Sequence, residues 1–311
     1  PADGQYGLVL AGLVDTGQAD ASRQVVCGAD ARLNGLTPLH VAVLARSAKL
    51  TERLLSFGKA DANGAAADGS TPLHLAARSG FPAAVSLLVK AGADPAAAEP
   101  QTGDTAWHLA VGHGHTDVVH GLMMACAPAP GAAPGSAWPG IAAVNQAGLT
   151  PLDVGLTQLW VASKGGAGGA AKETLQNIVV WLVSSGAAEP NRLIPSSSHV
   201  PNELRGLLPV HVAAMLGDHE LLQQLLERGG AEANKPALNG TTALQAAVKS
   251  GAPHLVSLLV KAGADTSVAD AATGDTVWHM AAAAGNGEVV TALMQANSSS
   301  SGSPVAGLGG P

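Results

Sequence analysis

Apolar and polar positions along this chain follow a helical period in short blocks, and the blocks come in pairs. In residues 72–79, leucine and alanine recur three and four positions apart, which predicts a short helix with a narrow apolar face. The bulkier stretch Val85–Val89 predicts a second helix that is closed by Gly92. Thr71 can accept a hydrogen bond from a free amide of the first turn, and Pro72 has no amide to leave unpaired there. The pattern therefore predicts helix-turn-helix units.

The units recur with a fixed period. Gly-x-Thr-Pro-Leu-His spans residues 35–40 and 69–74, and Gly-Asp-Thr-Ala-Trp-His spans 103–108, so both steps are 34 residues (69 − 35 and 103 − 69). Later copies of this front motif start at Gly148, Gly206, Gly240 and Gly274. A back motif, Ser-Leu-Leu-Val-Lys-Ala-Gly-Ala-Asp, spans 86–94 and returns unchanged at 257–265. Such self-similarity is the sequence signature of a repeat architecture.

These two motifs resemble those of the ankyrin repeat, and the resemblance covers about residues 35–297. It implies an all-α fold, an ankyrin-repeat solenoid of stacked helix-turn-helix units with short β-hairpin-like turns. One helix pair cannot bury both of its faces, so neighbouring units must stack. The resemblance also implies a non-catalytic scaffold for protein-protein interaction.

The ends and the middle of the chain depart from the period. Residues 1–34 are interpreted as a partial or capping repeat, because residues 8–14 have the pattern of a second helix without its first. Insertions are predicted near residues 127–140, 164–171 and 187–205, and a flexible Ser/Gly/Pro-rich tail is predicted at 298–311. Long loops in repeat arrays are usually disordered or functional. Trp138, in the first insertion, is expected either to fold back as a lid or to present an aromatic anchor.

The repeats before and after this irregular region are related by one offset, because 206 − 35, 240 − 69 and 274 − 103 all equal 171. This constant offset indicates a segmental duplication. Trp107 and Trp278 occupy the same position in duplicated repeats, and we expect both to be core side chains between helices. Trp160 and Trp181 lie on the predicted helices of the irregular fourth repeat and are also expected to be buried.

Histidine recurs at one place in the front motif. The five histidines are His40, His74, His108, His211 and His279. In ankyrin repeats this histidine typically bonds backbone at the repeat junction, so the resemblance implies a structural role for all five.

Composition narrows the class of protein. The chain has 311 residues and is 47% hydrophobic, 13% charged and 3% aromatic, and its many alanines favour close helix packing over a β-sandwich. The net charge of −7 is scattered, without a basic stripe, so nucleic acid and anionic membranes are poor partners. No apolar run approaches the roughly 20 residues that span a bilayer. Cys27 and Cys126 lie far apart in the sequence, which fits a reducing compartment. We expect the chain to be a monomeric module and, by default, to be cytoplasmic, with the nucleus as an alternative location.

Reactive side chains do not form a recognisable catalytic or metal motif. Four histidines fall within one repeat, at positions 108, 113, 115 and 120, but no cysteine or acidic set completes a tetrahedral zinc site. The glycine-rich stretch 165–169 lacks the preceding strand and the Gly-Lys-Ser/Thr ending of a phosphate loop. We therefore expect no enzyme activity, no metal and no cofactor.

A protein partner is expected on the concave face of the stack, where turn tips and the ends of first helices are free to vary. The candidate partner-binding residues are Arg32, Arg46, Asp68, Arg78, Gln101, Asp104, His113, Lys249, Asp270 and Asp275. Their mixture of charges suits a specific protein surface or an extended peptide. The alternative interpretation is an intramolecular regulatory ankyrin domain of a larger signalling enzyme or channel, suggested by the truncated first repeat and the missing initial methionine.

Overall fold

The computed structural model describes residues 35–57, 59–127, 138–165, 169–186 and 188–300. Within these ranges the chain forms fourteen α-helices and one 3₁₀-helix, and it contains no β-strand. Two compact units are distinguished: unit 1 is Pro1–Gln158 with Gly169–Ile178, and unit 2 is Leu159–Gly168 with Val179–Pro311. The predicted N-terminal partial repeat, with Arg32 in it, lies outside the described residues.

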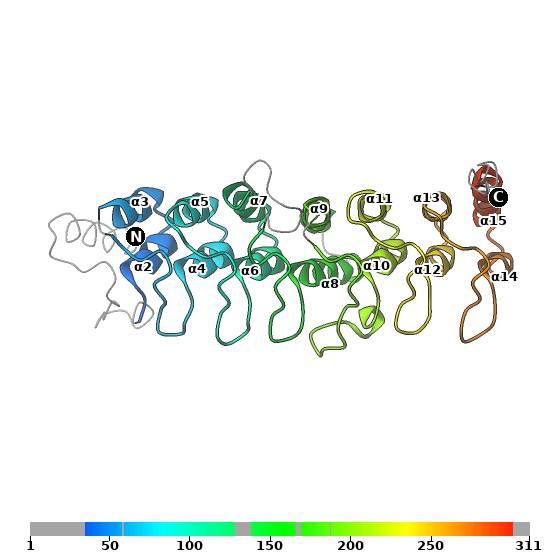
Figure 1. The fold of residues 1–311 in the computed structure, drawn as a ribbon, viewed down its shortest axis with the longest axis horizontal. Coiled ribbons are helices and arrows are strands. Elements are labelled where there is room, and N and C mark those ends of the chain that lie inside the picture. The colour runs from blue at the N-terminus through cyan, green and yellow to red at the C-terminus, as the bar shows by residue number, and fades with distance from the viewer. Residues whose placement is uncertain (1–34, 58, 128–137, 166–168, 187, 301–311) are drawn as a thin grey trace, which may run out of the picture. The chain divides into compact units, whose positions relative to one another are not determined.

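Unit 1 is built from helix pairs in two layers (Figure 1). Its helices are α2 (Pro38–Leu44), α3 (Ala48–Ser56), α4 (Pro72–Ser79), α5 (Pro82–Lys90), α6 (Ala106–Gly112), α7 (Thr116–Ala125) and the first parts of α8 (Pro151–Lys164) and α9 (Gly169–Ser184). The first helices α2, α4 and α6 form one layer and the second helices α3, α5 and α7 form the other. A long turn, here called a finger, precedes each of α4, α6 and α8 and extends away from the second-helix layer.

Unit 2 repeats the same two-layer arrangement (Figure 1). It contains the last parts of α8 and α9, then η2 (Asn202–Leu204), α10 (Pro209–Leu216), α11 (His219–Glu227), α12 (Ala243–Ser250), α13 (Pro253–Lys261), α14 (Val277–Ala283) and α15 (Gly287–Ser300). The first helices are α10, α12 and α14, and the second helices are α11, α13 and α15. The all-α ankyrin-type fold predicted from the repeats is therefore confirmed.

The first helices start where the front motif predicts. Thr71 caps α4, because its side chain accepts a hydrogen bond from the His74 amide, and His74 Nδ1 accepts from the Thr71 amide at 3.1 Å. The helix ends at Gly80, which adopts a left-handed conformation with φ 66° that a side chain would disfavour. Small Ala76 and Ala77 and large Leu88 are fully buried, so the two helices of the pair pack closely.

The same histidines join each repeat to the next finger. His74 Nε2 donates to the Ala97 carbonyl at 2.8 Å, because a carbonyl can only accept, and Nδ1 is thereby left to accept from the helix cap. Equivalent bonds run from His40 to Ser70 O, His108 to Leu149 O, His211 to Thr241 O and, with glutamine in place of histidine, from Gln245 to Val268 O. The predicted structural role is confirmed for four of the five histidines.

The last copy of the motif differs. His279 is exposed, and its ring bonds only Thr276 within the described residues. Trp278 beside it is only half-buried, as is Trp181, whereas Trp107 and Trp160 are buried as expected. The prediction that His279 bonds a neighbouring repeat and that Trp278 is a core side chain is therefore wrong for the described chain, since no described repeat follows α14 and α15.

The irregular fourth repeat is more helical than its sequence suggests. Helices α8 and α9 have 14 and 16 residues, whereas α4 and α5 have 8 and 9. Helix α9 begins at Gly169, inside the insertion expected at 164–171. Helix α15 continues to Ser300, past residue 298, where the tail is predicted to begin.

Within the insertion predicted at 187–205, residues 188–205 form part of an enlarged finger. Ile194 and Leu207 pair across it, with the Ile194 amide donating to the Leu207 carbonyl at 2.8 Å. The matching pair in an ordinary finger is Ala66 and Ser70, so the enlarged finger holds nine extra residues (207 − 194 = 13, against 70 − 66 = 4). The side chains of Ile194, Val200 and Leu204 are at most 2% exposed. The insertion is therefore packed rather than disordered.

Burial makes the junction histidines a source of acid sensitivity. Burial lowers the pKa of the His40, His74, His108 and His211 side chains below the ordinary value of 6.5, and the carbonyl bonds only partly offset it. The unfolded chain then binds more protons below about pH 6.5 than the folded chain does. The contribution of these neutral histidines to stability is fully present above that pH and decreases as the pH falls below it.

We expect the variant His74→Gln to fold, because Gln245 already makes both bonds at the equivalent position. With one buried histidine fewer, the free energy of unfolding should fall less steeply between about pH 6.5 and 5, by up to about 1.4 kcal/mol per pH unit. Urea denaturation at several pH values measures this slope. The exposed His279→Gln variant is the control, and an unchanged slope in His74→Gln would contradict the assignment.

Candidate partner-binding groove

A groove of about 320 Å³ lies on the first-helix side of unit 2. It is bounded by the end of α8, by α10 and α12, by the segment around η2 and by the finger before α12. The lining residues are Trp160, Lys164, Glu203, Leu207, His211, Met215, Asn239, Thr241, Ala246, Lys249 and Ser250. We call this site the first-helix groove.

The floor of the first-helix groove is apolar. Trp160, Leu207 and Ala246 are each 6% exposed, and Met215 is half-buried. Trp160 reaches this position because α8 runs for 14 residues, whereas α10 and α12 end after 8. An apolar floor with a few polar groups around it is the usual make-up of a binding pocket.

The rim of the first-helix groove carries charges of both signs. Lys164 Nζ lies 4.9 Å from the centre of the Trp160 ring, close enough for a cation–π interaction. Among the described residues Lys164 has no carboxylate partner, whereas Lys249 Nζ lies 3.0 Å from Asp270 Oδ2. Glu203 adds an exposed carboxylate to the lining of the groove. Lys164 is therefore the cation that is available to an incoming acidic group.

Two of the predicted binding residues belong to equivalent ion pairs. Arg78 Nη2 donates to both carboxylate oxygens of Glu99 at 2.6 and 2.8 Å, and the Glu99 side chain is only 8% exposed. The Lys249–Asp270 pair lies at the same positions in unit 2, because 78 + 171 = 249 and 99 + 171 = 270. Each pair ties a first helix to the next finger, so these charges are used in the fold.

Arg46 also bonds within the fold. Its guanidinium donates to the carbonyls of Ser79 and Gly80 at 2.7 and 2.8 Å, at the C-terminal end of α4, and lies 5.3 Å from the centre of the Phe81 ring. A cation is favourable there because the last carbonyls of a helix have no helical donor. Arg46 has φ 49°, at the position where other repeats have glycine.

The remaining predicted residues are distributed over the two units. Asp68 is exposed and accepts from the Ser70 hydroxyl and amide, and these bonds lower the pKa of its carboxyl group. Asp104 accepts from Asn145, Gln101 is exposed, Asp275 is half-buried, and the exposed His113 ring stacks on His115 at 5.9 Å between centroids. Only Lys249 lines the first-helix groove.

Sequence reasoning left Trp160 and Lys164 off the binding surface. Trp160 was expected to be buried, which is confirmed, but its place in the groove floor follows from the length of α8. The sequence does indicate that α8 is long, since no glycine or proline stop follows Pro151 at the distance where Gly80 ends α4.

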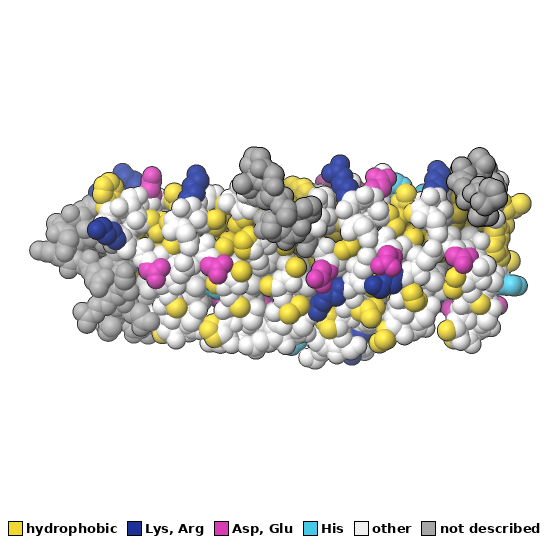
Figure 2. Space-filling view, in the orientation of Figure 1, with side chains coloured by type: hydrophobic (Ala, Val, Ile, Leu, Met, Phe, Trp, Pro, Cys, Tyr) yellow, Lys and Arg dark blue, Asp and Glu magenta, His cyan; other side chains and the backbone are white. Residues whose placement is uncertain are grey.

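Basic and acidic side chains are interspersed over the visible face of the molecule (Figure 2).

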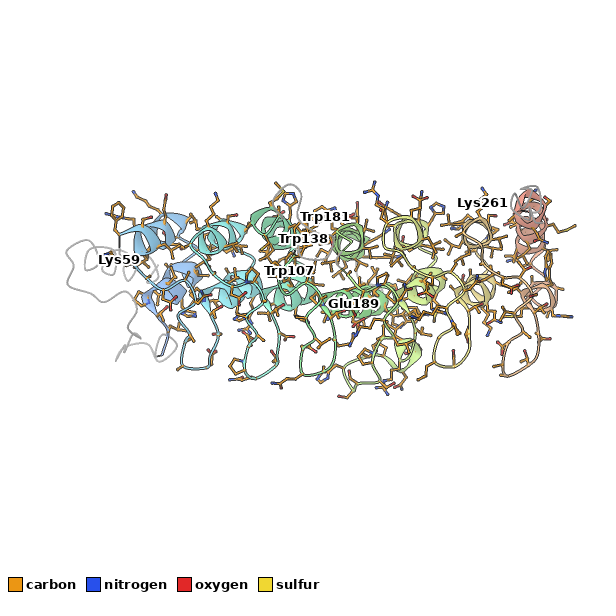
Figure 3. The ribbon with its side chains drawn as sticks, viewed as in Figure 1. Lys59, Trp107, Trp138, Trp181, Glu189 and Lys261 are labelled. Carbon is orange, nitrogen blue, oxygen red and sulfur yellow. The ribbon has the colours of Figure 1, made fainter. Side chains whose placement is uncertain are left out.

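Trp138 lies at the start of a finger rather than in a free loop. Its carbonyl accepts from the Ile141 amide at 3.1 Å, and its side chain is half-buried. The neighbouring Pro139 carbonyl accepts from Trp107 Nε1 at 2.8 Å, and Figure 3 shows the two tryptophans in the same part of unit 1. Residues 128–137 of this insertion lie outside the described residues. A lid or an anchor formed by Trp138 stays a prediction.

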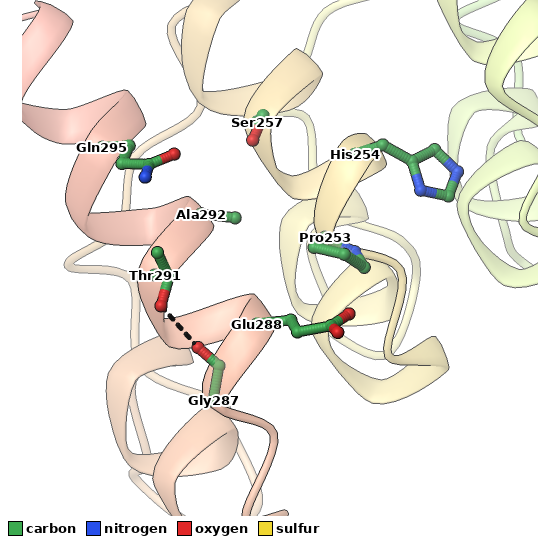
Figure 4. Close-up of a pocket in the computed structure, with 8 residues that line it drawn as sticks. All are labelled: Pro253, His254, Ser257, Gly287, Glu288, Thr291, Ala292 and Gln295. Atoms are coloured by element: carbon green, nitrogen blue, oxygen red, sulfur yellow. Dashed lines mark hydrogen bonds between the residues drawn. The ribbon is translucent and has the colours of Figure 1, made fainter.

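A second groove, of about 370 Å³, lies between α13 and α15 on the second-helix side of unit 2 (Figure 4). Pro253 and Ala292 are its only apolar lining side chains, and Thr291 Oγ1 donates to the Gly287 carbonyl at 2.8 Å. Because its lining is mainly polar, this groove lacks the anchor pocket of the first-helix groove.

Three further observations concern metal binding, thiol chemistry and membrane insertion. Within the described ranges no three His, Cys, Asp or Glu side chains gather as metal ligands. Burial raises the pKa of the Cys126 thiol to about 11, which keeps it protonated near neutral pH. No helix in the described part of the chain is long and apolar enough to cross a membrane.

Comparisons with known proteins agree with this architecture. The family model for ankyrin repeats, in three copies, matches residues 10–99, 68–131 and 210–302, and the chain belongs to this family. The structure is similar to the ankyrin repeat domain of Bcl-3, described as a unique member of the IkappaB protein family, with a TM-score of 0.58, 30% identity, and coverage of 84% of this chain and 99% of that chain.

It is also similar to the human ASB11 ankyrin repeat domain, with a TM-score of 0.49 and 20% identity over 84% of this chain and 97% of that chain. The search of curated proteins finds no match. Ankyrin repeats are generally protein-protein interaction modules, and the fold is typically non-catalytic.

We expect the variant Arg78→Ala to lower the free energy of unfolding by about 1 kcal/mol, because it leaves the nearly buried Glu99 carboxylate without its cation. The matched variant Lys249→Ala should cost less, since the Lys249 side chain is 56% exposed and makes a single bond. Urea denaturation of both variants gives the two values. Equal losses would show that the burial of Glu99 does not matter.

Proposed function

We propose that this chain is a non-catalytic scaffold that binds a protein partner, and that the partner inserts an apolar side chain into the first-helix groove. The observation that carries this proposal is the pairing of an apolar floor, with Trp160 and Met215 in it, and a cation without a carboxylate partner, Lys164, on the rim. Binding energy in protein interfaces is concentrated where an anchor side chain fills such a pocket.

The dimensions and chemistry of the groove favour a segment of protein. A volume of about 320 Å³ holds one or two large side chains, which is the size of a peptide anchor rather than of a folded domain. Asn239 and Thr241 lie on the same lining and offer polar groups to a peptide backbone. Lys164 favours an acidic residue beside the anchor, because opposite charges improve both encounter and register.

Four further predictions from the sequence stay predictions. They concern the roles of the remaining candidate residues, the monomeric state, the signalling context and the cytoplasmic location. A variant that changes Arg46, Arg78 and Lys249 together would be a poor test of binding, because all three side chains bond within the fold. A test of the first-helix groove needs side chains that the fold does not use.

The experiment selects peptides from a displayed library on the intact chain and measures their dissociation constants with groove variants. Met215→Glu places a charge on the apolar floor, and we expect it to weaken binding by at least about 30-fold. Lys164→Glu should weaken acidic peptides by about tenfold and change the selected consensus. Circular dichroism checks that both variants keep their helices.

The matched control is Lys261→Glu, which makes the same charge reversal at an exposed position on α13, labelled in Figure 3. It should leave every dissociation constant unchanged. If the selected peptides bind the two groove variants as tightly as the parent, the partner does not use the first-helix groove, and the proposal fails.

A further inference from the structure

The first-helix groove holds two charged side chains that the described fold does not neutralise. Three charged residues line it, Lys164, Glu203 and Lys249, and of these Lys249 forms an ion pair with Asp270. Lys164 and Glu203 are both exposed, and neither has an oppositely charged partner in the described part of the chain, including each other. An occupant of the groove therefore meets an unpaired cation and an unpaired anion.

The cation lies beside a buried hydrogen-bond donor on α8. Trp160 and Lys164 are one helical turn apart, and Lys164 Nζ lies 4.9 Å from the centre of the Trp160 ring. The Trp160 side chain is 6% exposed, yet its indole N–H makes no hydrogen bond within the described chain. A buried indole normally has an acceptor. A carboxylate from an occupant has two acceptor oxygens and can satisfy both the indole and the ammonium group.

The anion is held by the packed part of the enlarged finger. Glu203 lies in η2, next to Leu204, whose side chain is fully buried. Arg205, the cation closest to it in sequence, donates from Nε to the Val200 carbonyl at 3.1 Å and does not pair with Glu203. Packing therefore fixes the backbone that carries Glu203, while the carboxylate itself stays in solvent. A charge that is already positioned loses less entropy when it binds.

The two charges make different demands on one occupant. They come from two elements, α8 and η2, that line a single groove of about 320 Å³ with an apolar floor. A segment with only an acidic group leaves Glu203 without a partner, and a segment with only a basic group is repelled by Lys164. Near an apolar floor, where bound groups displace water, such a mismatch costs more than it does in open solvent.

We propose, in an inference that rests on the proposed function, that the partner segment carries charges of both signs beside its apolar anchor. Its acidic residue accepts from Trp160 Nε1 and Lys164 Nζ, and its basic residue donates to the Glu203 carboxylate. These contacts decide which sequence the groove selects, because a segment with the two charges exchanged meets like charge on both sides.

An exchange of charges tests this pattern. We expect the peptide most enriched from the displayed library to contain both an acidic and a basic residue, and a second synthetic peptide has these two residues exchanged. The parent chain should bind the first peptide at least about tenfold more tightly than the second. In the double variant Lys164→Glu with Glu203→Lys this preference should reverse by a similar factor, because both sides of the groove change sign.

The matched control is Lys261→Glu with Glu227→Lys, which exchanges two exposed charges on α13 and α11, outside the groove. It should keep the preference of the parent chain. Trp160→Phe removes the indole N–H and keeps an apolar ring. It should weaken the first peptide about fivefold more than it weakens a version of that peptide whose acidic residue is alanine.

Met215→Glu separates a failure of this charge pattern from a failure of the proposed function. If Met215→Glu weakens the first peptide, but the parent chain binds both peptides equally or the double variant keeps the parent's preference, the charge pattern is overturned and the proposed function stands. An enriched peptide that lacks either charge has the same meaning. If Met215→Glu has no effect, or the library yields no peptide, the proposed function fails and the charge pattern fails with it.

Discussion

Stacking of the repeats depends on a polar side chain that is buried at the junction between two neighbours. It is hydrogen-bonded on both sides at His40, His74, His108 and Gln245. In His74 the Nδ1 atom closes the cap of its own helix and Nε2 bonds the next finger. Burying a polar ring is costly unless both nitrogens are paired, so a repeat without a neighbour leaves this group unsatisfied. In the repeat of His211, Leu208 stands in place of the capping threonine, and His211 Nδ1 has no hydrogen-bond partner in the described chain. His211 Nε2 still donates to the Thr241 carbonyl at 2.8 Å, so the bond to the next finger is kept where the bond to the helix cap is lost.

The regular repeats could be predicted from sequence because their signals are local. A threonine cap, a proline in the first turn and a left-handed glycine such as Gly80 each act within a few residues of the helix end. The fourth repeat has weaker stops, so packing decides its limits. Burial of Ile178 and Leu182 holds α9 in place, although its first residues are the glycines and alanines of a typical loop.

The candidate partner-binding residues are harder to assess from sequence, because the groups that their charges contact are distant in sequence. Arg46 bonds carbonyls 33 and 34 residues away, and Arg78 bonds a carboxylate 21 residues away. A charge at the end of a first helix has the same appearance in sequence whether it is solvated or bonded to the next repeat. Even the left-handed backbone of Arg46, which costs about 1 kcal/mol for a residue with a side chain, is explained only by those carbonyls.

Duplication explains why similar repeats present different surfaces. Met215 and Lys249 have unit 1 counterparts at Leu44 and Arg78, but the tryptophan that completes the first-helix groove comes from α8, which lies outside the duplicated blocks. The first-helix groove therefore forms where the irregular fourth repeat lies next to a regular repeat. The sequence of either repeat alone does not contain all of the residues that line it. The same reasoning holds for the unchanged Trp-His pair, which is buried at Trp107 and His108, whereas Trp278 is half-buried and His279 is exposed. In a repeat protein of this kind, the neighbour of a motif decides its role.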